Sequence, residues 1–196
     1  MKPVSVIRGR IVPLDRRDVD TDQIMPKQFL TRVERTGFGD FVFHEWRQDP
    51  SFALNDARYA GATVLVAGPN FGSGSSREQA VWGLQQYGFE AILAPSFSDI
   101  FVGNCAQVGL LAACLEESAC QSLMAAAERD PAAEVSIDLN QRLLHYQGEQ
   151  IAFQVKDEVR SVLLRGLDDI SLMQAQLEQI ERYEAERPAW LPQAPA

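Results

Sequence analysis

Two short apolar segments, residues 61–68 and 89–96, place the strongest constraint on the fold of this chain. Each is a continuous apolar run bordered by glycine or proline, which is the pattern of a strand buried on both faces of a sheet. The residues between them begin with glycines and serines, continue with apolar residues at helical spacing and end at Gly88, a natural helix C-cap. We therefore predict a strand, a glycine-rich loop, a helix and a second strand parallel to the first.

The N-terminal part predicts one strand followed by loops. Residues 4–15 are rich in β-branched side chains and predict the first strand, and residues 16–30 are expected to form a polar loop interrupted by Pro26. Residues 31–46 place two glycines among aromatic side chains. We expect a mobile loop there that leads into a short segment anchored by its aromatic residues. The loop is expected to lack a packing partner in the isolated chain.

The part after residue 97 predicts a mixture of helices and strands. Residues 98–115 predict a short helix that returns as an apolar strand, and residues 117–131 predict a surface helix that ends at a proline. Apolar and polar residues alternate over 134–155 around Gly148, which indicates antiparallel strands joined by a turn.

The clearest helical pattern lies near the C-terminus. Asp168, Asp169 and Ser171 offer N-cap chemistry, and Pro188 is expected to end the helix. Its apolar residues recur every three or four positions: Ile170, Met173, Leu177, Ile180 and Tyr183. We find no repeat or linker, so we expect one α/β domain with a mixed sheet over residues 1–196, with a frayed tail at 188–196.

Charge and composition exclude several functional classes. Hydrophobic residues make up 46% of the 196 residues, enough for a buried core, and the formal net charge is −9. An acidic chain does not favour binding to nucleic acid or to a membrane surface. No apolar run approaches the ~20 residues that span a bilayer, and the N-terminus lacks the apolar region of a secretory signal.

The cysteines indicate neither a disulfide framework nor a metal site. Cys105, Cys114 and Cys120 are odd in number and lack the Cys-x-x-Cys spacing of most zinc or iron–sulfur sites. Reduced thiols in a cytoplasmic protein are the expected state. We therefore expect this chain to bind no metal itself.

The loop over residues 70–77 carries the most chemistry. It follows the first buried strand, where open α/β sheets bind ligands, and it leads into a helix whose first N–H groups favour negative charge. Gly72 and Gly74 allow positive φ or a close approach to a ligand. Arg77 can hold a carboxylate with two hydrogen bonds. The loop is therefore a candidate anion site.

A purely structural role for the same residues stays open. Ser75 and Glu78 fit a capping box, with Ser75 as N-cap and Glu78 reaching back to its backbone. The two interpretations are compatible, because an N-cap oxygen already faces the N–H groups that would stabilise an alkoxide.

Three familiar motifs do not fit this loop. It has no lysine for a P-loop, it has Arg77 where a dinucleotide fingerprint needs a third glycine, and it has Gly74 where a nucleophile elbow needs serine. His44 and His145 are the only histidines, so a catalytic triad has few candidates, and both are expected to be structural.

The ordered motifs closely resemble the small-subunit family of 3-isopropylmalate dehydratase, or isopropylmalate isomerase, in the aconitase superfamily. They are DVDTDQIMPKQFL, RTGFG, NFGSGSSRE, APSFSDIF, GN, GLL and the terminal GLDDISL…YE…P. The resemblance covers nearly the whole chain. It implies a swivelling β/β/α domain that closes over a large subunit, which carries a [4Fe–4S] cluster with one iron that binds substrate. The implied reaction is interconversion of 2-isopropylmalate and 3-isopropylmalate through 2-isopropylmaleate, in leucine biosynthesis in the cytoplasm.

The resemblance also implies roles for single residues. Ser75 would be the base that removes the carbon-bound proton, and Ser76 and Arg77 would hold a carboxylate of the small dicarboxylate substrate. Arg35, Thr36 and Gly37 would shape the pocket around the variable alkyl group, with Arg35 a secondary candidate for carboxylate contact. Gly72, Gly74 and Glu78 would support the serine loop.

Two departures from the family pattern leave the substrate open. Gln79 stands where many members carry histidine, and Ser73 where many carry cysteine. A paralogous small subunit acting on another alkylmalate, such as citraconate with 2-methylmalate or dimethylmalate, is one alternative. A non-catalytic module that binds carboxylates is the other.

Overall fold

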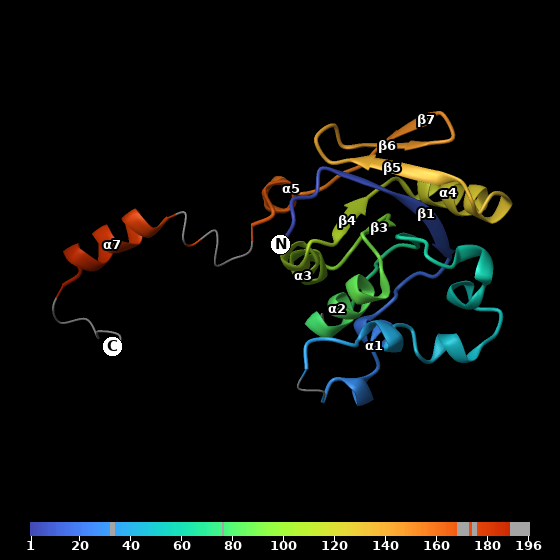
Figure 1. Ribbon diagram of the computed structural model, residues 1–196, viewed down its shortest axis with the longest axis horizontal. Helices are drawn as coiled ribbons and strands as arrows, with labels where there is room; N and C mark the ends of the chain where they lie inside the picture. Colours follow the sequence, from blue (N-terminus) through green and yellow to red (C-terminus); the bar gives the residue numbers. More distant parts are fainter. Residues whose placement is uncertain (32–33, 76, 168–172, 174–175, 189–196) are drawn as a thin grey trace.

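The computed structural model describes residues 1–31, 34–75, 77–167, 173 and 176–188. Within them, seven strands form one mixed sheet in the order β4-β3-β2-β1-β5-β6-β7 (Figure 1). The strands are β1 (Val6–Leu14), β2 (Val64–Ala67), β3 (Ala91–Ala94), β4 (Leu111–Cys114), β5 (Glu134–Asp138), β6 (Leu143–Tyr146) and β7 (Glu149–Ala152). The predicted mixed α/β sheet is confirmed.

The sheet changes direction at β1. Strands β1 to β4 run parallel to one another, with Val64 of β2 opposite Ala91 of β3. β5 pairs antiparallel with the first half of β1, and β6 and β7 continue that antiparallel half. Every residue of β2 and β3 is buried, which confirms the prediction drawn from their continuous apolar runs.

Helices cover both faces of the parallel half. α1 (Thr21–Ile24), α2 (Glu78–Tyr87) and α3 (Asp99–Val108) share a hydrophobic core with Leu65 and Ile92. α4 (Glu117–Arg129) and α5 (Asp157–Arg165) share a second core with Val64 and Leu93. Because neighbouring residues of a strand point to opposite faces, a strand between two helical layers must be apolar throughout.

The segment between β1 and β2 folds into short 3-10 turns packed by aromatic side chains. These turns are η1 (Lys27–Phe29), η2 (Gly39–Phe41), η3 (Trp46–Gln48), η4 (Ala53–Asn55) and η5 (Ala57–Tyr59). Phe43 is fully buried and stacks on Trp46 with ring centroids 5.2 Å apart. The guanidinium of Arg16 lies 4.1 Å from the Trp46 ring centroid. The prediction of a segment anchored by aromatic residues is confirmed.

The C-terminal third differs from the prediction in two places. The alternating segment forms three strands, so there is a second turn near Arg142, a residue with positive φ, besides the turn at Gly148. α5 was not predicted, although its acidic start and its left-handed cap at Gly166 are ordinary helix signals.

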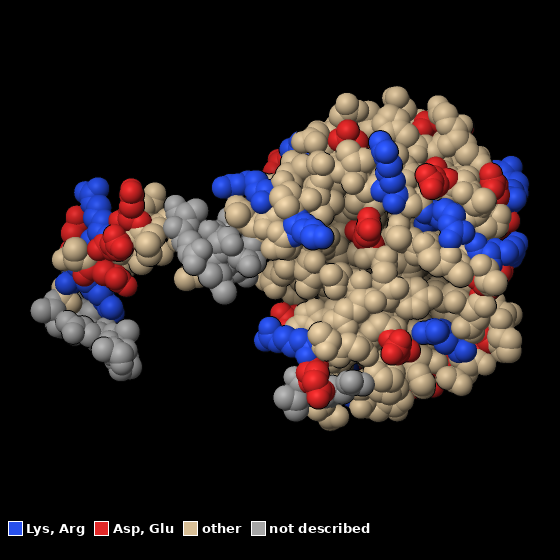
Figure 2. All heavy atoms as spheres, viewed as in Figure 1, with Lys and Arg blue, Asp and Glu red and all other residues tan. Residues whose placement is uncertain are grey.

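The last helix, α7 (Leu177–Glu186), keeps its predicted apolar stripe but buries no residue. Met173, Leu177 and Tyr183 are 61%, 52% and 64% exposed. Figure 1 shows α7 apart from the rest of the domain, and Figure 2 shows acidic side chains clustered on it. The predicted N-cap at 168–171 and the tail at 189–196 lie outside the described residues. Within the described part of the chain, no helix is long and apolar enough to cross a bilayer.

Because α7 makes no buried contact, its removal should leave the domain stable. A chain that stops after Gln176 should change the free energy of unfolding by less than about 0.5 kcal/mol, as for other exposed positions. Leu163→Ala, which truncates a fully buried side chain of α5, should cost about 2–5 kcal/mol. Urea denaturation followed by circular dichroism measures both. Equal destabilisation by the two changes would show that α7 packs on the domain.

Candidate active site

Backbone hydrogen bonds hold the glycine-rich loop after β2 against the segment after β1. The N–H of Gly68 donates to the carbonyl of Arg16 at 3.1 Å, and the N–H of Gly72 donates to the carbonyl of Val19 at 2.8 Å. In return, the N–H of Thr21 donates to the carbonyl of Ser73 at 3.0 Å. These bonds extend the pairing of β1 and β2 beyond the sheet edge, so the loop has a defined path.

The segment after β3 holds the same loop from its other side. The N–H of Phe71 donates to the carbonyl of Ser96 at 3.0 Å, and the N–H of Ser98 donates to the carbonyl of Phe71 at 3.2 Å. The N–H of Asn70 donates to the hydroxyl of Ser96 at 2.9 Å. Segments that follow three neighbouring parallel strands therefore meet at the carboxyl edge of the sheet, where a ligand site is expected.

Both predicted loop glycines have positive φ, 74° at Gly72 and 82° at Gly74. At Gly72 a Cβ would lie 2.2 Å from the ring of Phe101, closer than any real contact. At Gly74 a Cβ would meet the Cβ of Asp20 at 3.4 Å, an ordinary contact. The predicted backbone conformation is confirmed, and the close approach at Gly72 is to an aromatic ring of the core.

The predicted capping box at Ser75 is wrong. α2 begins at Glu78 and its N-cap is Arg77, whose side chain makes no capping hydrogen bond. The box lies instead at α1, where the N–H of Gln23 donates to Asp20 Oδ1 at 2.7 Å and the N–H of Asp20 donates to Gln23 Oε1 at 2.9 Å. Pairing of Ser73 with the Asp20–Thr21 segment draws the loop away from α2, so the helix begins later than the pattern predicts.

Ser75 therefore lies two residues before the N-cap of α2 and is exposed. Its hydroxyl is not fixed by the first turn of the helix. The positive end of the helix dipole acts within about one turn, so it still favours negative charge near this loop. Ser76, the predicted carboxylate contact, lies outside the described residues.

Arg77 forms an ion pair with Asp22 of α1. The Arg77 side chain is 21% exposed and that of Asp22 is 40% exposed. The ammonium of Lys27 lies 3.6 Å from the other carboxylate oxygen of Asp22. Two cations thus flank one carboxylate beside the serine loop. Asp22 and Lys27 were part of the quoted DVDTDQIMPKQFL motif, but sequence reasoning gave them no role.

The second group of candidate residues, Arg35, Thr36 and Gly37, lies against the C-terminal half of α2. The carbonyl of Arg35 accepts a hydrogen bond from Gln86 at 2.8 Å, and the Arg35 guanidinium lies 5.4 Å from the Trp82 ring centroid. Gln86 is nine residues beyond Arg77, about 13 Å along a helix axis. The structure thus places Arg35, Thr36 and Gly37 apart from the serine loop.

The expectation that this loop lacks a packing partner is wrong for residues 35–41. Phe38 is 1% exposed, and a Cβ on Gly39 would lie 2.8 Å from the α2 backbone at Gln86. The exposed side of the segment borders a hollow of about 470 Å³. Its lining comprises Thr36, Gly37, Gly39, Asp40, Gln85 and Gln86.

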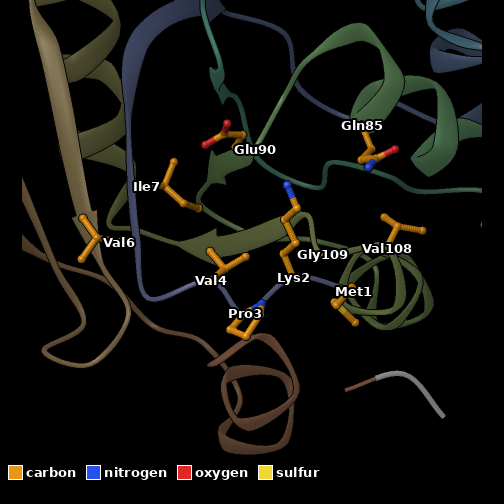
Figure 3. Close-up of a pocket in the computed structure, with 10 residues that line it drawn as sticks. All are labelled: Met1, Lys2, Pro3, Val4, Val6, Ile7, Gln85, Glu90, Val108 and Gly109. Atoms are coloured by element: carbon orange, nitrogen blue, oxygen red, sulfur yellow. The ribbon is translucent and has the colours of Figure 1, made fainter. Parts of the chain in front are cut away.

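The cavity of about 600 Å³ in Figure 3 lies at the other edge of the sheet. Its lining comes from the N-terminal segment, the end of α2, the start of β3 and the end of α3: Met1, Lys2, Pro3, Val4, Val6, Ile7, Gln85, Glu90, Val108 and Gly109. Strand β1 begins there with Val6, and β3 begins directly after Glu90, so the cavity is opposite to the edge that carries Ser75. None of the candidate site residues lines it.

The three cysteines are free and poorly suited to bind iron. Burial raises the pKa of Cys105 well above its usual value and that of Cys120 to about 12, where Cys114 and Glu117 add to the effect. Burial also raises the pKa of Cys114. Iron–sulfur clusters bind thiolates, which these environments disfavour. Among the described residues, no group of three His, Cys, Asp or Glu side chains could hold a metal ion.

Comparison with known proteins first defines the class of this chain. The Aconitase C-terminal domain family matches residues 1–118, which include β1 to β4 and the serine loop. A crystal structure of 3-isopropylmalate dehydratase from Methanocaldococcus jannaschii has a TM-score of 0.66 and 28% sequence identity to the chain. That match covers 90% of this chain and 99% of the other. The chain therefore has the aconitase-type fold.

Curated relatives then define the family more narrowly. Proteins named 3-isopropylmalate dehydratase small subunit from Parafrankia sp. and Rubrobacter xylanophilus are each 50% identical over 192 residues, covering 98% of both chains. The small subunit from Frankia alni is 50% identical over 194 residues, which is 99% of this chain and all of that protein. The chain belongs to the family of 3-isopropylmalate dehydratase small subunits.

The packing of the serine loop on Phe101 can be tested with two glycine variants. Gly72→Ala combines positive φ with a steric clash, so it should cost about 2–4 kcal/mol of unfolding free energy. Gly103→Ala is the control, because a Cβ there meets nothing within 4 Å and alanine favours the helix by about 0.5–1 kcal/mol. Thermal and urea denaturation measure both. A Gly72→Ala protein as stable as the parent would contradict the described loop.

Proposed function

We propose that this chain is the small subunit of 3-isopropylmalate dehydratase, a hydro-lyase of leucine biosynthesis. With a large subunit it would interconvert 2-isopropylmalate and 3-isopropylmalate through 2-isopropylmaleate. The observation that carries this proposal is 50% identity over nearly the entire length of relatives that bear this name. The serine loop, held at the carboxyl edge of the sheet, supports it independently.

Ser75 is the proposed base. In the dehydration direction its oxygen takes the proton from the carbon next to a carboxylate, the carbon–oxygen bond breaks, and the hydroxyl group leaves as water after gaining a proton. The reverse direction returns the Ser75 proton to carbon. A serine oxygen can act in this way only in a polar, water-excluded site, because water would protonate it. Since Ser75 is exposed here, closure by a partner is part of the proposal.

Arg77, with Ser76, is the proposed carboxylate holder. The planar guanidinium can bind a carboxylate through two parallel hydrogen bonds. The Asp22 carboxylate already forms an ion pair with this guanidinium, so an incoming carboxylate must share or replace that ion pair. Lys27, on the other side of Asp22, can neutralise the carboxylate that is displaced. The substrate's negative charge would thus enter a site where two cations flank one acid, a net charge of +1 for these three side chains.

The proposed partner is the large subunit, and the [4Fe–4S] cluster is proposed to reside there. The raised pKa values of the cysteines support this division. The exposed apolar residues of α7 supply surface that a partner can cover. Free cysteines support a cytoplasmic location. We also propose that residues 1–196 act as a single swivelling domain and that Arg35, Thr36 and Gly37 border the substrate's alkyl group once the partner closes.

A second candidate is a small subunit for another alkylmalate, such as 2-methylmalate or dimethylmalate. Gln79, in the first turn of α2, and Ser73, paired with Asp20, are the departures that favour it. Assays of the two-subunit enzyme with isopropylmalate, methylmalate and dimethylmalate distinguish the two candidates. Preferred turnover of a smaller alkylmalate would select the second.

The role of Ser75 predicts a loss of rate without a loss of stability. Ser75→Ala should lower kcat by on the order of 10²–10⁴-fold, because a base is lost. Its unfolding free energy should stay unchanged, since Ser75 is exposed and caps no helix. Ser122→Ala, at an exposed serine of α4, is the matched control and should leave kcat unchanged. A folded, partner-bound Ser75→Ala enzyme with parental turnover would refute the base role and favour a carboxylate-binding module.

The proposed division of roles, with the cluster on the large subunit and the serine loop on this chain, predicts the behaviour of the chain alone. After anaerobic incubation with iron and sulfide, the purified chain should show no stoichiometric cluster absorbance and no dehydratase activity. Addition of the reconstituted large subunit should restore activity. Absorption spectra and single-substrate assays measure both. A stable cluster with turnover in this chain alone would overturn the two-subunit proposal.

A further inference from the structure

The side-chain amide of Gln86 binds residues 35–38 through both of its polar atoms. Its Nε2 donates to the carbonyl of Arg35 at 2.8 Å, and its Oε1 accepts from the N–H of Phe38 at 2.9 Å. The donor and the acceptor of one short, planar group thus hold the start and the end of the Arg35–Phe38 turn. We call this pair of bonds the Gln86 clamp.

Trp82 lies one helical turn before Gln86 on α2, and its ring also contacts the Arg35–Phe38 turn. The Phe38 ring meets the Trp82 ring edge-on with centroids 5.8 Å apart. The Arg35 guanidinium lies over the same indole. Gly39 then passes so close to the α2 backbone that a Cβ has no room. The turn is therefore seated on α2 by packing, while the Gln86 clamp fixes the two backbone groups at its ends.

We propose that Gln86 is a positioning residue that sets selectivity for the substrate's alkyl group by fixing Arg35, Thr36 and Gly37 relative to Ser75. This inference rests on the proposed function. Its basis is that α2 is one ten-residue helix that begins just after the serine loop and carries Gln86 near its end. The separation between the proton-transfer loop and the Arg35–Phe38 turn is therefore set by a rigid length of helix.

The chemistry of the Gln86 clamp predicts a ranking of variants. Gln86→Leu removes both hydrogen bonds and leaves a shorter apolar side chain at this position. Gln86→Glu keeps an acceptor for the Phe38 N–H but faces the Arg35 carbonyl with another acceptor, so it retains one bond and adds repulsion. Gln121→Leu makes the same chemical change at an exposed position of α4 and is the matched control.

Trypsin cleavage after Arg35 tests the Gln86 clamp in the chain alone. Loss of two hydrogen bonds should raise the rate of cleavage at this bond by about five- to thirty-fold in Gln86→Leu. Gln86→Glu should lie between it and the parent, and Gln121→Leu should match the parent. Mass spectrometry identifies the bond that is cut. An unchanged rate at Arg35 in Gln86→Leu would show that the Gln86 clamp does not hold this turn.

Kinetics of the two-subunit enzyme test the positioning role. Gln86→Leu should lower the ratio of kcat/KM for isopropylmalate to that for methylmalate by on the order of tenfold, mainly through KM, since even one methylene in a hydrophobic pocket is worth about 10–200-fold. Gln86→Glu should recover part of this ratio. A purely structural role would lower both activities equally and leave the ratio unchanged, which would overturn the inference.

The two experiments fail in different ways. A parent enzyme that turns over neither alkylmalate would refute the proposed function and the selectivity role together, while proteolysis would still decide whether the Gln86 clamp exists. Faster cleavage at Arg35 with an unchanged kinetic ratio would confirm the Gln86 clamp but refute its role in selectivity. Both changes together, absent in Gln121→Leu, support the full inference.

Discussion

The arrangement of the candidate site depends on the hydrogen bonds that hold the serine loop between the segments after β1 and after β3. Gly72 donates to the Val19 carbonyl and Phe71 donates to the Ser96 carbonyl, so the loop is paired on both sides before α2 begins. The absence of a side chain at Gly72 lets the loop lie on Phe101. These bonds give the loop backbone up to Ser73 a defined path, and in the proposed enzyme a partner would have to fix the Ser75 hydroxyl itself.

The helix that follows connects the two groups of candidate residues. α2 begins at Glu78, directly after Arg77, and its Gln86 holds the Arg35–Phe38 turn. Its buried face packs into the same core as β2 and β3. As long as the Gln86 clamp holds, the serine loop and the Arg35–Phe38 turn therefore keep their separation along α2. In the proposed two-subunit enzyme, domain closure would move both groups as one unit toward the partner.

The sequence predicted the elements whose signals are local and missed those decided by long-range pairing. Burial on both faces leaves a continuous apolar run in the sequence, which predicted the strands Val64–Ala67 and Ala91–Ala94. A left-handed helix cap favours glycine, which predicted the end of α2 at Gly88. Two capping boxes were available, at Ser75 and at Asp20, and only the pairing of Ser73 with Asp20 decides between them. Docking of Phe38 on α2 likewise depends on Gln86, 48 residues away along the chain. α5 carried local signals and could have been predicted.

Under the proposed function, the charges around Arg77 would allow an exposed serine loop to become a specific site when substrate and partner bind. In the chain alone, Asp22 lies against Arg77 and close to Lys27, so these two cations and one acid carry a net charge of +1. Both side chains of the Arg77–Asp22 pair are only partly buried, at 21% and 40% exposed, so rearranging the pair costs less than breaking a fully buried one. A dicarboxylate brings more negative charge than Asp22 alone can offer, and exclusion of water by a partner strengthens its attraction to Arg77. In the proposed enzyme, binding of substrate and closure of the partner would favour each other, because each would strengthen the other's electrostatic contacts.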